Sequence, residues 1–179
     1  MQQSLMVPVN ERRDHIRGHL DAPVTLLEYG DFECPDCGAA HEVITRLRAV
    51  LGHDLRFVYR HFPLTETHFH AALAAEAAEA AGSQHKFWMM HDLLFANQHA
   101  LEERHLAAYA GAIGLELSPF LDSLDLHIHA SRVREDSLSG ARSGVSSTPA
   151  FFVNEVRYEG PHDFDSLLDA IEVVGSMKR

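Results

Sequence analysis

Two cysteines separated by two residues are the side chains of this sequence best suited to chemistry. Cys34 and Cys37 are the only cysteines among 179 residues, and Pro35 and Asp36 lie between them. A disulfide joining them would close a very short loop, so it would restrict the unfolded chain little and stabilise the fold little. A lone pair at this spacing is typical either of a redox-active dithiol or of two metal ligands.

Zinc is the alternative that the rest of the sequence disfavours. A structural zinc site takes four ligands, commonly a second pair of Cys or His residues at close spacing. The pairs His68/His70 and His127/His129 could supply it, but both lie far along the chain and neither has the usual spacing. We therefore expect no metal at the cysteines and a redox-active dithiol instead.

The segments around the cysteines predict a strand, a short loop and a helix. Residues 24–29 are mostly apolar or β-branched, which indicates a buried strand. Apolar residues then recur at helical spacing from Pro35 until Gly52. Proline suits the first helical turn because its missing N–H would have no intrahelical partner there, and this places Cys34 at the N-cap.

Cys34 is the predicted nucleophile and Cys37 the predicted resolving thiol. Helix N-termini and Cys-x-x-Cys geometry lower the pKa of a cysteine below its free value of about 8.5, and the thiolate is the attacking species. Cys37 lies one turn into the helix. From there it can attack the mixed disulfide formed at Cys34 and release the partner.

The composition predicts one compact acidic unit. With 46% hydrophobic residues the chain is long enough to bury a core, and its formal net charge is -11 with a pI near 5.6. This charge disfavours nucleic acid and anionic membrane surfaces as partners, and no apolar stretch is long enough to cross a bilayer. No export signal is recognisable at residues 1–10, so we expect a cytoplasmic protein, or an extracytoplasmic one if a leader was removed.

Helices are predicted between two groups of strands. A hairpin is expected at residues 150–153 and 156–158. Its turn residues, Asn154 and Glu155, depart from the Asn-Gly that such turns prefer, which leaves the turn geometry open. Helices are predicted over residues 68–81, 84–96, 102–112, 118–124, 127–142 and 164–174, with Ser118-Pro119 as a cap and first-turn proline.

The 14 histidines are interpreted mainly as scattered surface residues. His61 and His91 have no Cys, Asp or Glu at a spacing that defines a site. The aromatic and Met-rich residues 87–90 could line a substrate groove, but a helix of such apolar density is more often packed in the core. We therefore expect core packing there.

Four segments of the sequence resemble the DsbA-like branch of the thioredoxin superfamily. The resemblance runs from about residue 14 to residue 172. Similar domains also occur fused behind sodium/proton antiporters. The segments are residues 21–34 (DAPVTLLEYGDFEC), 55–64 (LRFVYRHFPL), 87–95 (FWMMHDLLF) and 144–154 (GVSSTPAFFVN).

This resemblance implies an α/β thioredoxin fold with the order β-α-β, helical insert, β-β-α. Residues 1–179 would form a single DsbA-like domain. Its thioredoxin-fold core would comprise about residues 14–65 and 143–175, and an all-helical insertion would comprise about residues 66–142.

The resemblance also implies a substrate site beside the cysteines. Pro149 would follow a cis peptide bond, so that the Thr148 backbone can pair with an extended peptide while the ring keeps metal ions from the thiolates. The alternative is an ordinary trans turn. Glu28 would be a buried acid beneath the disulfide that accepts the proton Cys37 loses before it attacks. The alternative is that Glu28 is a solvated carboxylate at a sheet edge.

The expected enzyme is a protein-disulfide oxidoreductase. It would exchange electrons with protein thiols and disulfides, or with glutathione as co-substrate, and need no bound cofactor. Asp36, helped by Asp31 and Glu33, should oppose the Cys34 thiolate and keep the reduction potential low, which favours a reductase. In an exported protein an oxidase or isomerase would be favoured. Two other classes stay open: a glutathione-dependent transferase of the related fold branch, and a non-catalytic binding module that senses redox state.

Overall fold

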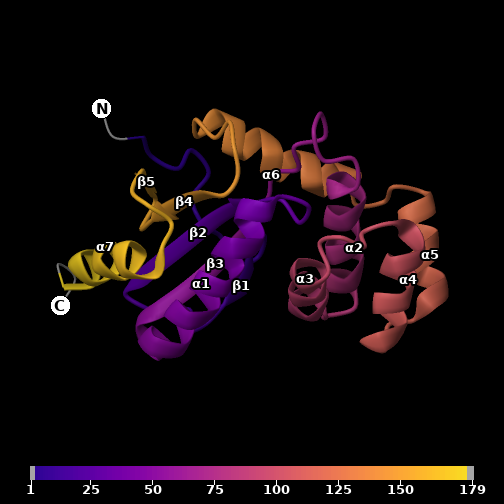
Figure 1. Cartoon of the computed structure of the whole chain (residues 1–179), viewed down its shortest axis with the longest axis horizontal. Helices are drawn as coiled ribbons and strands as arrows, with labels where there is room; N and C mark the ends of the chain where they lie inside the picture. Colours follow the sequence, from indigo (N-terminus) through magenta and orange to yellow (C-terminus); the bar gives the residue numbers. More distant parts are fainter. Residues whose placement is uncertain (1–2, 177–179) are drawn as a thin grey trace.

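A mixed five-stranded sheet forms the centre of the molecule (Figure 1). The computed structural model describes residues 3–176. The strand order is β1-β3-β2-β4-β5, in which only the β2/β3 pair is parallel. The strands are β1 (His15–Arg17), β2 (Val24–Gly30), β3 (Leu55–His61), β4 (Ala150–Val153) and β5 (Val156–Tyr158).

Helices cover the sheet and extend beyond one end of it. Figure 1 shows α2 to α5 grouped beside the sheet, while α6 runs back towards it. α1 and α7 pack on each other, and α6 packs on β2 and β3. The helices are α1 (Pro35–Leu51), α2 (Ala71–Ser83), α3 (Phe87–Ala96), α4 (Glu103–Ala112), α5 (Leu117–Asp125), α6 (Ala130–Arg142) and α7 (Phe164–Ser176), with one 3-10 turn at Gly52–Asp54.

The predicted order β-α-β, helical insert, β-β-α is confirmed, and one strand is added to it. β1 pairs antiparallel with β3 and forms an edge of the sheet. The sequence analysis missed this strand because its three residues, all half-buried, are too few to show an alternating pattern.

The central strand β2 is buried on both faces, as its continuous apolar sequence predicts. Val24 and Leu26 face the larger core, which α1, α7 and the inserted helices complete. Leu27 and Tyr29 face a smaller core on the opposite side. Side chains alternate along a strand, so Glu28 lies on the same face as Leu26, beneath α1.

The β4/β5 hairpin closes with a turn in which both central residues are left-handed. Asn154 has φ 44° and Glu155 has φ 70°, the positive values that a type I′ turn requires. Asn154 is held by three hydrogen bonds to the start of β2: its N–H donates to the Thr25 carbonyl, its Oδ1 accepts from the Thr25 N–H, and its Nδ2 donates to the Pro23 carbonyl. These contacts specify the turn without a glycine.

Three details of the predicted helices are wrong. Helices α2, α3 and α6 each begin three residues later than expected. Helix α5 has Glu116 at its N-cap, so Ser118 is not the cap, and Pro119 lies third in the helix, where its missing N–H is still tolerated. Met89 is 51% exposed rather than in the core, although Phe87 and Met90 are buried as expected.

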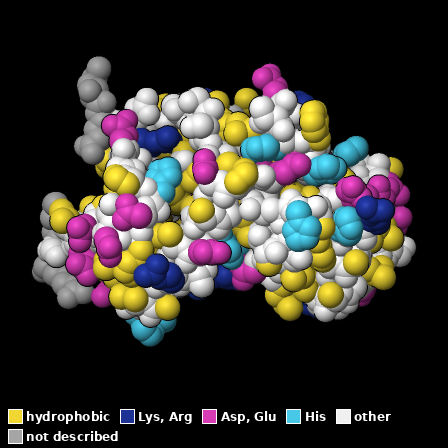
Figure 2. Space-filling view, viewed as in Figure 1, with side chains coloured by type: hydrophobic (Ala, Val, Ile, Leu, Met, Phe, Trp, Pro, Cys, Tyr) yellow, Lys and Arg dark blue, Asp and Glu magenta, His cyan; other side chains and the backbone are white. Residues whose placement is uncertain are grey.

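On the face seen in Figure 2, charged side chains are more often acidic than basic. Figure 2 shows Asp, Glu and His residues spread over the visible face, whereas Lys and Arg residues occur in separate places. This distribution agrees with the formal net charge of -11. Within residues 3–176, none of the helices combines the length and the apolar character that crossing a bilayer requires.

Candidate active site: the Cys34 and Cys37 thiols

Cys34 is the N-cap residue of α1, and Pro35 occupies the first helical turn. The Cys34 carbonyl accepts the N–H of Gly38 at 3.1 Å, which closes that turn. Cys34 is 6% exposed and Cys37 is fully buried, and both are free thiols. The helix therefore presents one sulfur at the edge of the protein surface and holds the other behind it.

The two thiols have very different affinities for protons. A hydrogen bond with Cys37 is the main cause that lowers the pKa of Cys34; burial opposes it, and hydrogen bonds with Thr148 and with the backbone of Cys37 and Asp36 lower the pKa further, to about 5. Burial raises the pKa of Cys37 far above its usual value, and the nearby Cys34 and Glu28 add to this rise. At neutral pH Cys34 is therefore a thiolate and Cys37 a thiol.

Glu28 is a buried acid on the cysteine side of the sheet. It is 1% exposed, and its Oε1 has no hydrogen-bond partner within residues 3–176, so the solvated alternative is wrong. Burial raises the pKa of Glu28 to about 8, and the charge of Cys34 adds to the rise. Glu28 in turn is among the groups that raise the pKa of Cys37. Its proposed role as proton acceptor remains a prediction.

Thr148 and Pro149 lie beside the sulfur of Cys34. The peptide bond between them is cis, and the Thr148 carbonyl oxygen lies 3.5 Å from Cys34 Sγ. Next to them a groove runs along the first turns of α1. Residues that line the groove include Asp36, Val43, Ser147, Thr148, Pro149 and His162.

The acids near the cysteines are paired with histidines, which the sequence analysis did not foresee. His68 Nδ1 lies 2.8 Å from Asp31 Oδ2, and His70 Nδ1 lies 3.0 Å from Glu33 Oε1. Hydrogen bonding and charge attraction to Asp31 raise the pKa of His68, although its partial burial opposes this. Asp31 and Glu33 therefore each have a histidine beside them, and the expectation that they oppose the Cys34 thiolate remains a prediction.

Gln98 from the inserted helices also fixes the active-site loop. Its Nε2 donates to the carbonyl oxygens of Phe32 at 2.9 Å and Cys34 at 2.8 Å. No signal in the sequence indicates this contact, because Gln98 lies 64 residues from Cys34.

Two histidines interpreted as surface residues are buried. His61 and His91 are each 1% exposed. His61 is paired with Glu79, and His91 with Asp92. Glu79 is brought to His61 by the fold, across 18 residues of sequence, whereas Asp92 directly follows His91.

The fold and the site together define a class of protein, in which a thioredoxin-type sheet carries a helical insertion and a dithiol at a helix N-cap. The family model described as Thioredoxin matches residues 10–173. The chain belongs to the thioredoxin family, and its solved structural neighbours are DsbA-type proteins.

Two solved structures illustrate the likeness in fold. Oxidised BdbD from Bacillus subtilis has a TM-score of 0.83 at 24% identity, covering 98% of this chain and 96% of that one. The alpha-DsbA1 protein of Wolbachia pipientis has a TM-score of 0.80 at 18% identity, covering 97% and 96%.

The curated relatives are longer proteins. Na(+)/H(+) antiporter NhaA 1 of Salinispora arenicola is 47% identical over 167 residues, which make up 93% of this chain and 26% of that protein. Na(+)/H(+) antiporter NhaA of Herminiimonas arsenicoxydans is 44% identical over 165 residues, or 92% and 26%. The chain thus spans about a quarter of the length of the curated relatives it matches, which is consistent with a fused thioredoxin-like domain.

Proposed function

We propose that this protein is a thiol–disulfide oxidoreductase that acts on protein thiols and disulfides through Cys34 and Cys37. The observation that carries the proposal is the contrast between the two sulfurs. Cys34, at a helix N-terminus with a pKa of about 5, is ionised and partly accessible, whereas Cys37 is buried and protonated. This is the arrangement that thiol–disulfide exchange needs, with one attacking thiolate and one thiol held in reserve.

The exchange proceeds in two steps. The Cys34 thiolate attacks a substrate disulfide, forms a mixed disulfide and releases one substrate sulfur as a thiolate. Cys37 then loses its proton to the ionised form of Glu28 and attacks Cys34 Sγ, which forms the Cys34–Cys37 disulfide and releases the second substrate sulfur as a thiolate. Two electrons pass from the dithiol to the substrate, and the reverse sequence oxidises a substrate dithiol.

The low pKa of Cys34 favours the oxidising direction. A stabilised thiolate stabilises the reduced form of the couple and so makes the disulfide the stronger oxidant. The sequence argument for a reductase depended on acids acting on this thiolate, and two of those acids are paired with histidines. We therefore propose a reduction potential closer to that of DsbA, about -120 mV, than to that of thioredoxin, about -270 mV.

The first measurement is the reduction potential, obtained by equilibrating the protein in graded thiol buffers and trapping the free thiols. A value above about -180 mV supports an oxidant, and a value near -270 mV overturns the proposed direction but not the dithiol chemistry. An oxidising potential would suit a compartment that tolerates disulfides, and a reducing one would suit the cytoplasm.

Turnover separates the proposed function from its alternatives. Dithiothreitol-driven insulin reduction should be accelerated by the protein and not by Cys34→Ser. Cys37→Ser should retain the first step and accumulate a mixed disulfide with the substrate. A transferase would instead conjugate glutathione to an electrophile and keep that activity in Cys37→Ser, and a binding module would show no turnover in either assay.

A further inference from the structure

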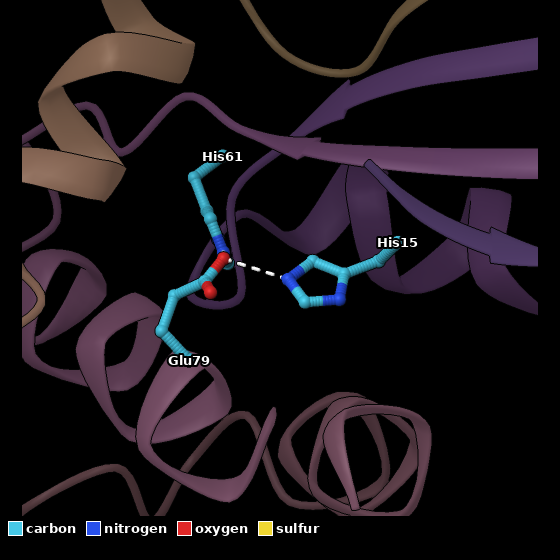
Figure 3. Close-up of side chains that lie close together, drawn as sticks. All are labelled: His15, His61 and Glu79. Carbon is cyan, nitrogen blue, oxygen red and sulfur yellow. Dashed lines mark hydrogen bonds and ion pairs between the residues drawn. The ribbon is translucent and has the colours of Figure 1, made fainter. Parts of the chain in front are cut away.

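Two histidines and a glutamate from distant parts of the sequence meet inside the molecule (Figure 3). Nε2 of His15 lies 2.9 Å from Oε1 of Glu79, and Nε2 of His61 lies 2.8 Å from the same oxygen. The three donor atoms all lie within 4.8 Å of one another. Figure 3 shows both rings directed towards the carboxylate.

The three residues come from three elements that the fold must hold together. His15 is on the edge strand β1, His61 is the last residue of β3, and Glu79 is on α2 of the insertion. His61 and Glu79 are buried, at 1% and 7% exposed, whereas the side chain of His15 is 20% exposed. The cluster is thus enclosed, with one side open to solvent.

Aromatic rings surround the two imidazoles. The ring of His15 stacks on Phe87 with centroids 3.4 Å apart and planes 3° apart, and the ring of His61 contacts Phe32, Tyr59 and Phe87 edge-on or at a tilt. Such packing fixes the orientation of each ring. An apolar shell of this kind also limits solvent access to a bound ion and so strengthens its attraction to its ligands.

We propose that Nε2 of His15, Nε2 of His61 and Oε1 of Glu79 bind one divalent transition-metal ion of the zinc class, with water completing the coordination. Two imidazole nitrogens and one carboxylate oxygen form a donor set that such ions prefer. Metal–ligand distances of about 2.0–2.2 Å require the three atoms to separate by only a few tenths of an ångström. Because the side chain of His15 is 20% exposed, the water would reach the ion from that side.

The charge state of Glu79 suits a metal ligand. Burial alone would raise the pKa of Glu79, but hydrogen bonds from His15 and His61 hold it far below its usual value, so the carboxylate is ionised. The charge of Glu79 also acts on Arg132, but Arg132 is itself paired with Asp136 at 2.6 Å. Within residues 3–176, the Glu79 carboxylate is paired with the two imidazoles.

A second cluster, His41, His91 and Asp92, also combines two imidazoles with one carboxylate, but its charge is less suitable. Both guanidinium nitrogens of Arg17 bind Asp92, at 3.1 and 2.8 Å, so a cation already neutralises this carboxylate. Like charges repel, and a metal ion here would have to compete with Arg17. This cluster therefore supplies a matched control.

The test is a zinc titration of the disulfide form, monitored by calorimetry. Any metal already bound is first removed with a chelator. The disulfide form is used so that the cysteine thiols take no part in metal binding. We expect one equivalent to bind and the melting temperature to rise with zinc concentration. Loss of an outer-shell partner of a metal site weakens binding about 10- to 100-fold, and His15→Ala, which removes a ligand, should weaken zinc binding by more than this. His41→Ala should bind zinc as tightly as the unaltered protein does.

Cobalt(II) provides a second measurement that does not depend on any variant. The unaltered disulfide form should give the visible d–d bands of a nitrogen and oxygen site, without a thiolate charge-transfer band, and zinc should remove them. Glu79→Gln keeps the side-chain shape and should abolish the bands. The proposal is overturned if no zinc binds, if His15→Ala binds equally well, if His41→Ala loses binding, or if cobalt gives no bands.

Discussion

Asp31 connects the His68 ring to the buried sulfur of the active site. Its Oδ2 lies 2.8 Å from Nδ1 of His68 and accepts the Leu64 N–H at 2.8 Å, and its own N–H donates to Cys37 Sγ at 3.4 Å. Asp31 is itself 1% exposed. The segment after β3 and the loop before Cys34 are therefore joined through one carboxylate, whose charge is balanced by a titratable ring.

Replacing His68 with Ala should raise the pKa of Cys34. Without the ring, the Asp31 charge would act on the Cys34 thiolate without compensation, and a nearby like charge disfavours ionisation. We expect a rise of up to about one unit and a less oxidising disulfide. The pKa of Cys34 is measured from thiolate absorbance as a function of pH in the reduced protein. His53→Ala, at an exposed ring, should leave the titration unchanged, and an unaltered curve in His68→Ala would show that the pair has no influence on Cys34.

Glu28→Gln should remove a pH-dependent loss of stability. The pKa of Glu28 is raised from 4.5 to about 8 in the folded protein, so the folded state binds more protons than the unfolded state between these values. The free energy of unfolding therefore falls as pH rises from about 4.5 to 8, by about 1.4 kcal/mol for each unit of pKa difference, or on the order of a few kcal/mol.

Urea unfolding of the disulfide form at several pH values measures this, since neither cysteine titrates there. The slope with pH should be flatter in Glu28→Gln than in the unaltered protein. Resolution of the mixed disulfide should also be slower, because the proton acceptor for Cys37 is gone. Equal slopes in the two proteins would rule out the raised pKa.

Gly30→Ala should destabilise the sheet beneath the active site. A Cβ at this position would lie 2.5 Å from Tyr59 Cε2 and 2.9 Å from Glu28 Oε1, and both neighbours are fully packed. Overpacking of this kind costs about 1–3 kcal/mol. Gly111→Ala in α4 is the control, since its Cβ would meet nothing closer than 4.0 Å and should stabilise the helix by up to about 1 kcal/mol. Chemical unfolding compares the two, and a harmless Gly30→Ala would contradict the packing argument.

Asp14→Asn should be strongly destabilising. Arg60 donates to both carboxylate oxygens of Asp14, at 2.8 and 2.9 Å, and both side chains are fully buried. Removing one partner of such a pair leaves a buried charge without compensation and costs about 3 kcal/mol. Thermal and urea unfolding measure the loss. Glu102→Gln breaks the exposed contact with Arg104 and should change the stability by less than about 1 kcal/mol.

The same pair predicts acid sensitivity. Burial would raise the pKa of Asp14, but hydrogen bonding and charge attraction to Arg60 lower it overall. The contribution of the pair is therefore present at neutral pH and lost as pH falls through the lowered pKa of Asp14. Unfolding of Asp14→Asn should depend less on pH in the acid range than unfolding of the unaltered protein, and an equal dependence would contradict the assignment.

Local patterns were enough to predict the elements that hold the dithiol. The apolar run of β2, the proline after Cys34 and the apolar spacing of α1 depend on neighbours within a few residues, so strand, loop and N-cap could be derived directly. The remaining α/β order followed from the resemblance and is confirmed.

The sequence by itself determined that a Cys-x-x-Cys pair begins a helix after a buried strand, because backbone geometry and burial of alternating side chains are local requirements. Only the tertiary structure decided what surrounds that pair. His68 contacts Asp31 across 37 residues of sequence, and Gln98 contacts Cys34 across 64. His15 meets Glu79 across 64 residues. Such partners are brought together by packing of whole elements, and a buried polar group is satisfied by whichever group the packing places beside it.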